Sequence, residues 1–356
     1  MSVERRSLQK KRKKRRRIAS VLMFVVFFTV LTAGGYGAFL YNKAQSVIDD
    51  SYKPLDRQSG KRDKQVNPDI DNISILFVGI DDSEARDFKS ASRTDALMLA
   101  TLNEKDKSIK LLSIPRDSLV YIPSKGYEDK INHAYGKGGI TSTIETVENF
   151  LDVPVDYYVQ MNFEAFIDVV DALDGIKVEV PYELHEKDSR DKSGAIYLKP
   201  GVQTLDGEQA LALARTRKQD SDIYRGKRQQ EILKAIMTKA ASAKSITKYS
   251  DVMEAVGDNM QTDLSFSEMK ALVDYATAGS KLNVETMSLE GSDAMIDGVY
   301  YYQLDEEALQ QTILNLKTHL KVSSASDVNK IAEKDADQDL SDTEEEDSEY
   351  IYTDEE

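Results

Sequence analysis

The sequence predicts an α/β domain in which helices cover both faces of a mixed central sheet. Two observations carry this prediction, and a third adds an element ahead of the domain. Short apolar runs of strand length alternate with longer segments whose apolar residues recur at helical spacing. The 356-residue chain is 40% hydrophobic, which is enough for a sizeable core. A long uncharged run near the N-terminus adds one transmembrane helix ahead of the domain.

The first half of the predicted domain mixes strands with two helices. The run at 73–78 is continuously apolar and ends at Gly79, as expected for a strand buried on both faces. Further strands are predicted at 96–102, 109–114, 155–160 and 176–180, and helices at 141–151 and 162–173. The second helix carries Phe163, Phe166 and Val170 at helical spacing, so it is amphipathic.

The second half is richer in helix and ends in an acidic tail. Strands are expected at 284–289 and 300–302, and a final helix at 304–320. The folded domain is therefore assigned to residues 71–322. Residues 334–356 carry a net charge of −11, and no apolar pattern follows residue 323. Such a segment cannot offset its ordering entropy, so 323–356 is expected to be disordered.

The N-terminus has the pattern of a membrane anchor. Residues 1–17 carry a charge of +9, and 18–40 is an uncharged 23-residue run. That length spans a hydrocarbon core of about 30 Å, and the basic flank stays in the cytoplasm. We therefore expect a single-pass protein of the cell membrane, with a polar stalk at 41–70 and the domain outside the cell. Cleavage near Ala33 remains an alternative.

Charge and composition limit the class of function. Without the two charged ends, the body of the chain has a net charge of −13, whereas a general nucleic-acid binder would show a broad basic surface. The chain has no cysteine, which excludes disulfides and thiolate metal sites. No Walker loop or GxSxG elbow is present, so a nucleotide-dependent kinase or a serine hydrolase has no support.

One basic stretch, residues 209–234, interrupts this acidic body. It begins and ends with helical apolar patterns and carries Arg215, Arg217, Lys218, Arg225, Lys227 and Arg228 between them. Two helices that face each other across a loop would aim several guanidinium groups into one space. Arginine binds phosphate oxygens with two parallel hydrogen bonds, so an anion site is predicted. The alternative is an ordinary solvated basic face.

Three short polar motifs lie at the ends of predicted strands. They are Gly79-Ile80-Asp81-Asp82, Arg93-Thr94-Asp95 and Ser113-Ile114-Pro115-Arg116-Asp117. Ligands of open α/β sheets collect outside strand ends, so Asp81, Asp95 and Arg116 are expected to converge. Two carboxylates together with phosphate oxygens are a usual way to hold Mg²⁺. The alternative is that these acids are turn residues or helix caps.

The ordered set of motifs resembles the LytR–CpsA–Psr family. The motifs are GID at 79–81, RTD at 93–95, SIPRD at 113–117, KINHAY at 130–135, LDG at 173–175, LDGEQAL at 205–211 and RTR…DSDIYRGKRQ at 215–229. Each is weak alone, but together they follow the family's order over the motif core, residues 71–240. Family membership implies a phosphotransferase on the outer face of a Gram-positive membrane. Its donor would be an anionic glycopolymer, wall teichoic acid, on an undecaprenyl-pyrophosphate carrier, and its acceptor peptidoglycan.

The resemblance also implies the site residues and the metal. The carboxylates for Mg²⁺, or for Mn²⁺ in its place, would be Asp81 and Asp95. The pyrophosphate ligands would be Arg93, Arg116, Arg215, Arg217, Arg225, Arg228 and Gln229, and the catalytic set Arg116, Arg217 and Asp95. An apolar tunnel would hold the polyprenyl tail. A polyprenyl-pyrophosphate phosphatase, a ligase for a capsule-type polymer and a non-catalytic lipid-binding regulator of the cell envelope remain alternatives.

Overall fold

A computed structural model describes the domain. The described residues are 51–57, 59–62, 64–68, 70–80, 93–216, 222–240, 259–277 and 283–322, with four more between 39 and 46. Within this set, no helix is long and apolar enough to cross a bilayer. The predicted span at 18–40 lies outside it except for Phe39, as do the basic segment 1–17 and the acidic tail 323–356.

A mixed six-stranded sheet forms the centre of the molecule. Its order is β11-β6-β1-β2-β3-β12. The strands are β1 (Ile73–Ile80), β2 (Thr94–Asn103), β3 (Ser108–Ser113), β6 (Tyr157–Met161), β11 (Met260–Thr262) and β12 (Asn283–Ser288). β1 runs antiparallel to β2 and parallel to β6, and β3 runs antiparallel to β2 and parallel to β12. The predicted α/β class and the mixed sheet are confirmed.

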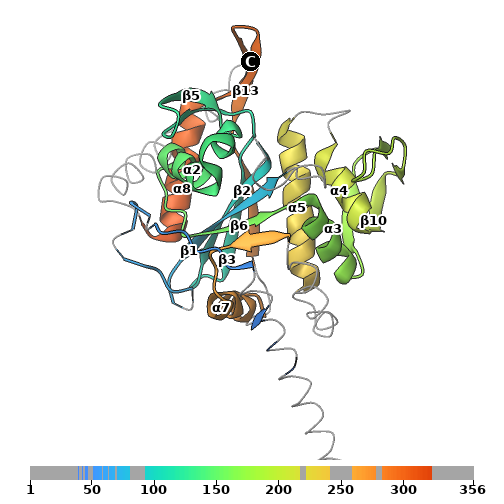
Figure 1. Ribbon diagram of the computed structural model, residues 1–356, viewed down its shortest axis with the longest axis horizontal. Helices are drawn as coiled ribbons and strands as arrows, with labels where there is room; N and C mark the ends of the chain where they lie inside the picture. Colours follow the sequence, from blue (N-terminus) through green and yellow to red (C-terminus); the bar gives the residue numbers. More distant parts are fainter. Residues whose placement is uncertain are drawn as a thin grey trace, which may run out of the picture.

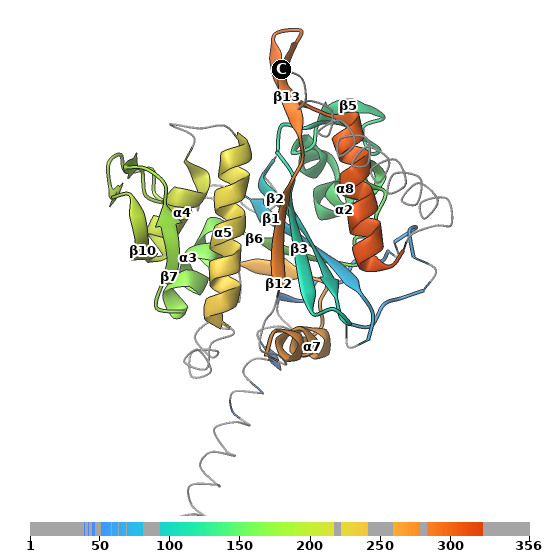
Figure 2. The same ribbon diagram turned by 180° about the vertical axis from the view of Figure 1, so that it is seen from behind.

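Helices cover both faces of this sheet. Helices α2 (His133–Leu151) and α8 (Glu306–Leu320) lie on one side, and α3 (Phe163–Ala172), α4 (Gly207–Arg215) and α5 (Asp222–Ala240) on the other (Figures 1 and 2). Successive side chains of β1 point to opposite faces of the sheet, so β1 contributes to the core on each face. Leu76 belongs to the cluster under α2 and α8, whereas Ile75 belongs to the cluster that includes Leu233 of α5.

Shorter hairpins surround the sheet, and the sequence predicted few of them. The pairs are β4 (Leu119–Ile122) with β5 (Tyr127–Lys130), β8 (Leu184–Glu186) with β9 (Ile196–Leu198), and β13 (Gly291–Ile296) with β14 (Val299–Leu304). The last hairpin projects from the end of the domain opposite α7 (Phe266–Thr277) (Figure 1). The strand predicted at 176–180 forms as β7 (Ile176–Val180), but it pairs with β10 (Gly201–Leu205) outside the central sheet.

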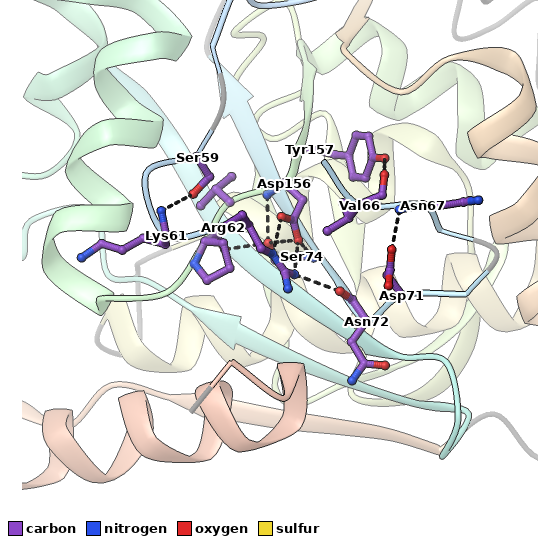
Figure 3. A network of polar contacts seen from close by, with 12 residues as sticks. Ser59, Lys61, Arg62, Val66, Asn67, Asp71, Asn72, Ser74, Asp156 and Tyr157 are labelled. Atoms are coloured by element: carbon purple, nitrogen blue, oxygen red, sulfur yellow. Dashed lines mark hydrogen bonds and ion pairs between the residues drawn. The ribbon is translucent and has the colours of Figure 1, made fainter. Parts of the chain in front are cut away.

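The N-terminal segment before β1 is tied to the domain by partly buried ion pairs. Arg62 donates from Nε and Nη2 to the two carboxylate oxygens of Asp156, at 2.9 and 2.7 Å. The same carboxylate accepts from the backbone and hydroxyl of Ser74 in β1 (Figure 3). Arg57 pairs with Glu148 of α2 at 3.0 Å. This part of the predicted stalk therefore has a fixed position against the folded domain.

The half-buried carboxylate of Asp263, directly after β11, makes the stability of the fold depend on pH. Burial raises the pKa of Asp263 from 3.8 to about 6, although Tyr158 N donates to it. The folded protein then binds more protons than the unfolded chain between these values, so stability should fall as pH rises from about 4 to about 6. Asp263→Asn should flatten that part of a plot of Tm against pH. An unchanged slope in the variant would assign the dependence to other groups.

Candidate active site

The candidate site lies where the ends of three neighbouring strands meet. Gly79 near the end of β1 pairs with Ala96 near the start of β2, because these strands are antiparallel. Ile114, directly after β3, donates its N–H to Leu97 O at 3.0 Å. Two residues later, the Arg116 guanidinium reaches the Asp95 carboxylate and forms an ion pair with it. The expected convergence of Asp95 and Arg116 is therefore observed.

The geometry around Arg116 is set by its neighbours on both sides. Its Nη1 donates to Asp95, and its Nε lies 3.5 Å from Oδ2 of Asp117. The backbone is also held, since Asn132 N donates to Arg116 O at 3.1 Å. The side chain of Arg116 is 23% exposed, so it is only partly screened by water.

Helix α5 brings Arg225 to the same place. Gly226 makes this approach possible, because a Cβ at this position would lie 2.3 Å from Oγ of Ser113, the last residue of β3. The glycine in the RGKR segment therefore serves close packing of a helix on a strand end. As a result, Arg225 and Arg116 line one cavity.

Gly226→Ala tests this packing. Alanine is the better helix former by about 1 kcal/mol, so without the contact the change would favour α5. We expect the contact with Ser113 to displace the helix and to lower turnover, by up to about 10²-fold for a shift near 1 Å. The double variant Gly226→Ala with Ser113→Gly removes the clashing group and should recover most of the rate in a transfer assay. Loss of rate without recovery would contradict this explanation.

Arg215 and Gln229 complete the polar end of the cavity. Arg215 closes α4 and donates from Nη2 to the carbonyls of Lys187 and Asp188, and its guanidinium lies 5.9 Å from the centre of the Phe163 ring. Gln229 donates to Ala214 O at 3.2 Å. The loop after β8 therefore holds Arg215, and the end of α4 holds Gln229, at the cavity wall.

Arg228 has a different position from the other arginines. It is buried and donates from Nε to Leu213 O at 3.0 Å and from Nη2 to Thr216 O at 2.6 Å. Carbonyls in the last turn of a helix lack partners within the helix, so Arg228 stabilises the end of α4. It does not line the cavity. Its role toward pyrophosphate stays a prediction, and its observed contacts are structural.

An apolar cavity of about 510 Å³ extends from these polar groups between the sheet and helices α3, α4 and α5. Its apolar wall comes from three strands and three helices and includes Phe77, Met98, Met161, Phe163, Phe166, Val169, Leu211, Ile232, Leu233 and Ile236. Its polar lining includes Asp95, Arg116, Arg215, Arg225 and Gln229, together with Glu186, Lys187 and Asp191 from the end of β8 and the region after it. A ligand that fits this site has an anionic head and a long apolar tail.

Several predicted residues are outside the described part of the chain or away from the cavity. Asp81 and Arg217 lie outside the described residues. Arg93 is exposed and does not line the cavity. His133, in the KINHAY motif, contacts Oδ2 of Asp129 through Nδ1 at 2.9 Å.

The sequence did not identify the residues of the apolar wall, although part of the signal was present. Phe163 and Phe166 were predicted as one apolar helix face, and Ile232 and Leu233 belong to the helical apolar pattern that ends the basic stretch. All four line the cavity, and Ile232 is buried whereas Phe166 and Leu233 are half-buried. A periodic pattern cannot distinguish a face that packs on a core from one that lines a cavity.

The fold and the site together define an α/β protein that combines an arginine-rich anion site with an apolar cavity. The profile described as the LytR_cpsA_psr family matches residues 38–318. The chain belongs to the LytR–CpsA–Psr family.

Named relatives cover most of the chain. The polyisoprenyl-teichoic acid–peptidoglycan teichoic acid transferase TagT of Bacillus subtilis is 41% identical over 323 residues, which are 90% of this chain and 99% of the relative. TagU of Halalkalibacterium halodurans is 39% identical over 81% of this chain and 93% of its own length.

Solved structures agree with this assignment. A structure of TagT bound to LIIa-WTA superposes with a TM-score of 0.66 at 42% identity, covering 76% of this chain and all of that one. A structure of the LytR-CPS2A-psr family protein YwtF (TagT) with bound octaprenyl pyrophosphate lipid has a TM-score of 0.62 at 39% identity, with 76% and 100% covered.

Proposed function

We propose that the chain is a membrane-anchored phosphotransferase that moves wall teichoic acid from an undecaprenyl-pyrophosphate carrier to peptidoglycan. The observation that carries the proposal is the cavity, which joins an apolar channel to a cluster of guanidinium groups. The relatives named as transferases at about 40% identity over nearly their whole length support the same reaction. The predicted anchor at 18–40 would keep the domain on the outer face of the cell membrane.

Each half of the site has a separate task in this reaction. The apolar wall takes the polyprenyl chain, and burial contributes about 0.8 kcal/mol per CH₂ removed from water, most of which the bilayer offsets. The anionic head group lies against Arg116 and Arg225. Phosphoryl transfer requires mainly positioning and charge stabilisation, and fixed guanidinium groups supply both to the phosphate that leaves with the carrier.

Asp95 and Asp81 are the proposed ligands of Mg²⁺. Among the described residues, no group of three acidic or histidine side chains forms a metal cluster. The donor set still fits, because Mg²⁺ is usually held by one or two carboxylates together with substrate phosphates and water. Asp95 lines the polar end of the cavity, where such phosphates would lie. When bound there, the ion would neutralise charge on the phosphate oxygens.

Asp95 also contacts Arg116. Pyrophosphate must therefore compete with Asp95 for Nη1 of this arginine, or share it. A metal ion at Asp95 would weaken that competition, because it takes up the carboxylate charge. Arg116 would then be available to the phosphate oxygens.

The experiment is to incubate the purified protein with a lipid-linked teichoic acid precursor, Mg²⁺ and nascent peptidoglycan, and to identify the products by mass. The proposal predicts a phosphodiester-linked adduct of the polymer with peptidoglycan. Release of polymer phosphate without the adduct would make the protein a phosphatase. Recovery of intact lipid under all conditions would make it a binding protein.

A further inference from the structure

We infer that Asp117, together with Lys130, is a positioning pair that fixes the guanidinium of Arg116 for the pyrophosphate. The inference rests on the proposed function. Asp117 lies outside the cavity lining, whereas Arg116 belongs to it. Asp117 therefore acts on the ligand only through the arginine.

The two carboxylates beside Arg116 differ in their surroundings. Asp95 is at the polar end of the cavity with a side chain 32% exposed, and it competes with phosphate for Nη1. The Asp117 side chain is 11% exposed and lies 3.5 Å from Nε on the other edge of the guanidinium. Nε is buried and forms no hydrogen bond to the described residues, so Asp117 holds it as an ion-pair partner rather than as a hydrogen-bond acceptor. Phosphate can displace Asp95 while Asp117 still holds Nε.

Lys130 keeps Asp117 from neutralising the arginine. Its Nζ lies 3.0 Å from Oδ1 of Asp117, on the carboxylate oxygen that does not face Arg116. The side chains of Lys130 and Asp117 are 17% and 11% exposed, so the interaction is poorly screened. Because one carboxylate is shared by two cations, the group of three retains one positive charge. That charge is available to the pyrophosphate.

Backbone hydrogen bonds fix the positions of Asp117 and Lys130 relative to each other. Ile131 N donates to Ser118 O at 2.9 Å, which places Lys130 beside Asp117. Tyr302 N of β14 donates to Asp117 O at 2.9 Å. The Lys130 ammonium also lies 5.6 Å from the ring centres of Tyr300 and Tyr301, a cation–π distance that limits its movement. Three segments distant in sequence therefore fix one carboxylate behind Arg116.

The test is a double-mutant cycle between Asp117→Asn and Arg116→Ala, read as the affinity for farnesyl pyrophosphate by calorimetry. In the wild-type background, Asp117→Asn should weaken binding about tenfold, less than the roughly 10²-fold cost of a 1 Å misplacement, because the backbone contacts remain. In the Arg116→Ala background it should change affinity less than about twofold, since the group it positions is absent. Asp129→Asn is the matched control. Within the described residues, its carboxylate pairs with Lys125 at 2.6 Å and contacts His133 and the backbone N–H of Lys130, but not Arg116, so affinity should be unchanged.

Each outcome decides the question. Equal losses in both backgrounds, or an equal loss in Asp129→Asn, would show a general structural effect and overturn the inference. Wild-type affinity in Asp117→Asn would also overturn it, while weakened binding in Arg116→Ala would still support the proposed function. If the wild-type protein does not bind farnesyl pyrophosphate, both fail. In the transfer assay, a higher KM for the lipid with an unchanged melting temperature would separate positioning from partial unfolding, which lowers the apparent kcat and leaves KM unchanged.

Discussion

Arg116→Lys is expected to reduce transfer by about 10²–10³-fold while the protein remains folded. Lysine keeps the positive charge but has a single ammonium group. It cannot bind two phosphate oxygens with a planar fork or contact Asp95 and Asp117 from opposite edges as Arg116 does. The measurement is the rate of adduct formation at saturating lipid, together with a melting curve.

Lys227→Ala is the matched control for this loss. Lys227 belongs to the same basic run but is exposed, with its ammonium 5.4 Å from the centre of the Tyr224 ring. Removing it should leave the rate near that of the wild type. Equal losses in the two variants would mean that the basic run acts only as a diffuse positive field. Full activity in Arg116→Lys would remove this residue from the catalytic set.

Among the substitutions proposed for stability, Asp156→Asn should lower the free energy of unfolding most. The Asp156 side chain is 3% exposed and accepts hydrogen bonds from Arg62 and Ser74, so the amide leaves a nearly buried guanidinium without its countercharge. Removing one partner of a buried pair typically costs about 3–5 kcal/mol; we expect about 2–3, because Arg62 keeps its bond to Asn72 O. Tm should then fall by roughly 5–10 °C.

Asp152→Asn provides the comparison for a surface carboxylate. Asp152 pairs with Lys61 and Lys317, but its side chain is 49% exposed. Exposed pairs of this kind contribute about 0–1 kcal/mol each, so its Tm should fall by only a few degrees. Asparagine tolerates the left-handed backbone at this position, where φ is 49°. Equal losses of Tm in the two variants would contradict the larger contribution that we assign to the Arg62–Asp156 pair.

The long elements could be predicted because their patterns are local. The apolar run at 73–78 lies within β1, and the helix predicted at 162–173 appears as α3, with Asn162 as its N-cap accepting from Ala165 N. The short strands of the β8–β9 and β4–β5 hairpins have three or four residues each, too few for a periodic signal.

The polar half of the site could also be predicted, because its residues occur in short motifs at strand ends. Asp95 and Arg116 are close in space for that reason. Arg228 shows the limit of this reasoning. It has the same residue type and motif as Arg225, but it lies three positions further along α5, and its guanidinium contacts the end of α4. Which of two helical arginines faces the cavity depends on how α5 packs on β3 at Gly226, a contact between segments far apart in sequence.

The most direct test of the account is a crystal structure of the domain with geranylgeranyl pyrophosphate. The account predicts that the prenyl chain lies between the central sheet and helices α3–α5, in contact with Phe77, Phe166 and Ile232. The phosphates should contact Arg116 and Arg225 at the polar end. A prenyl chain bound outside this cavity, or phosphates held elsewhere with Arg116 still paired only to Asp95, would contradict it.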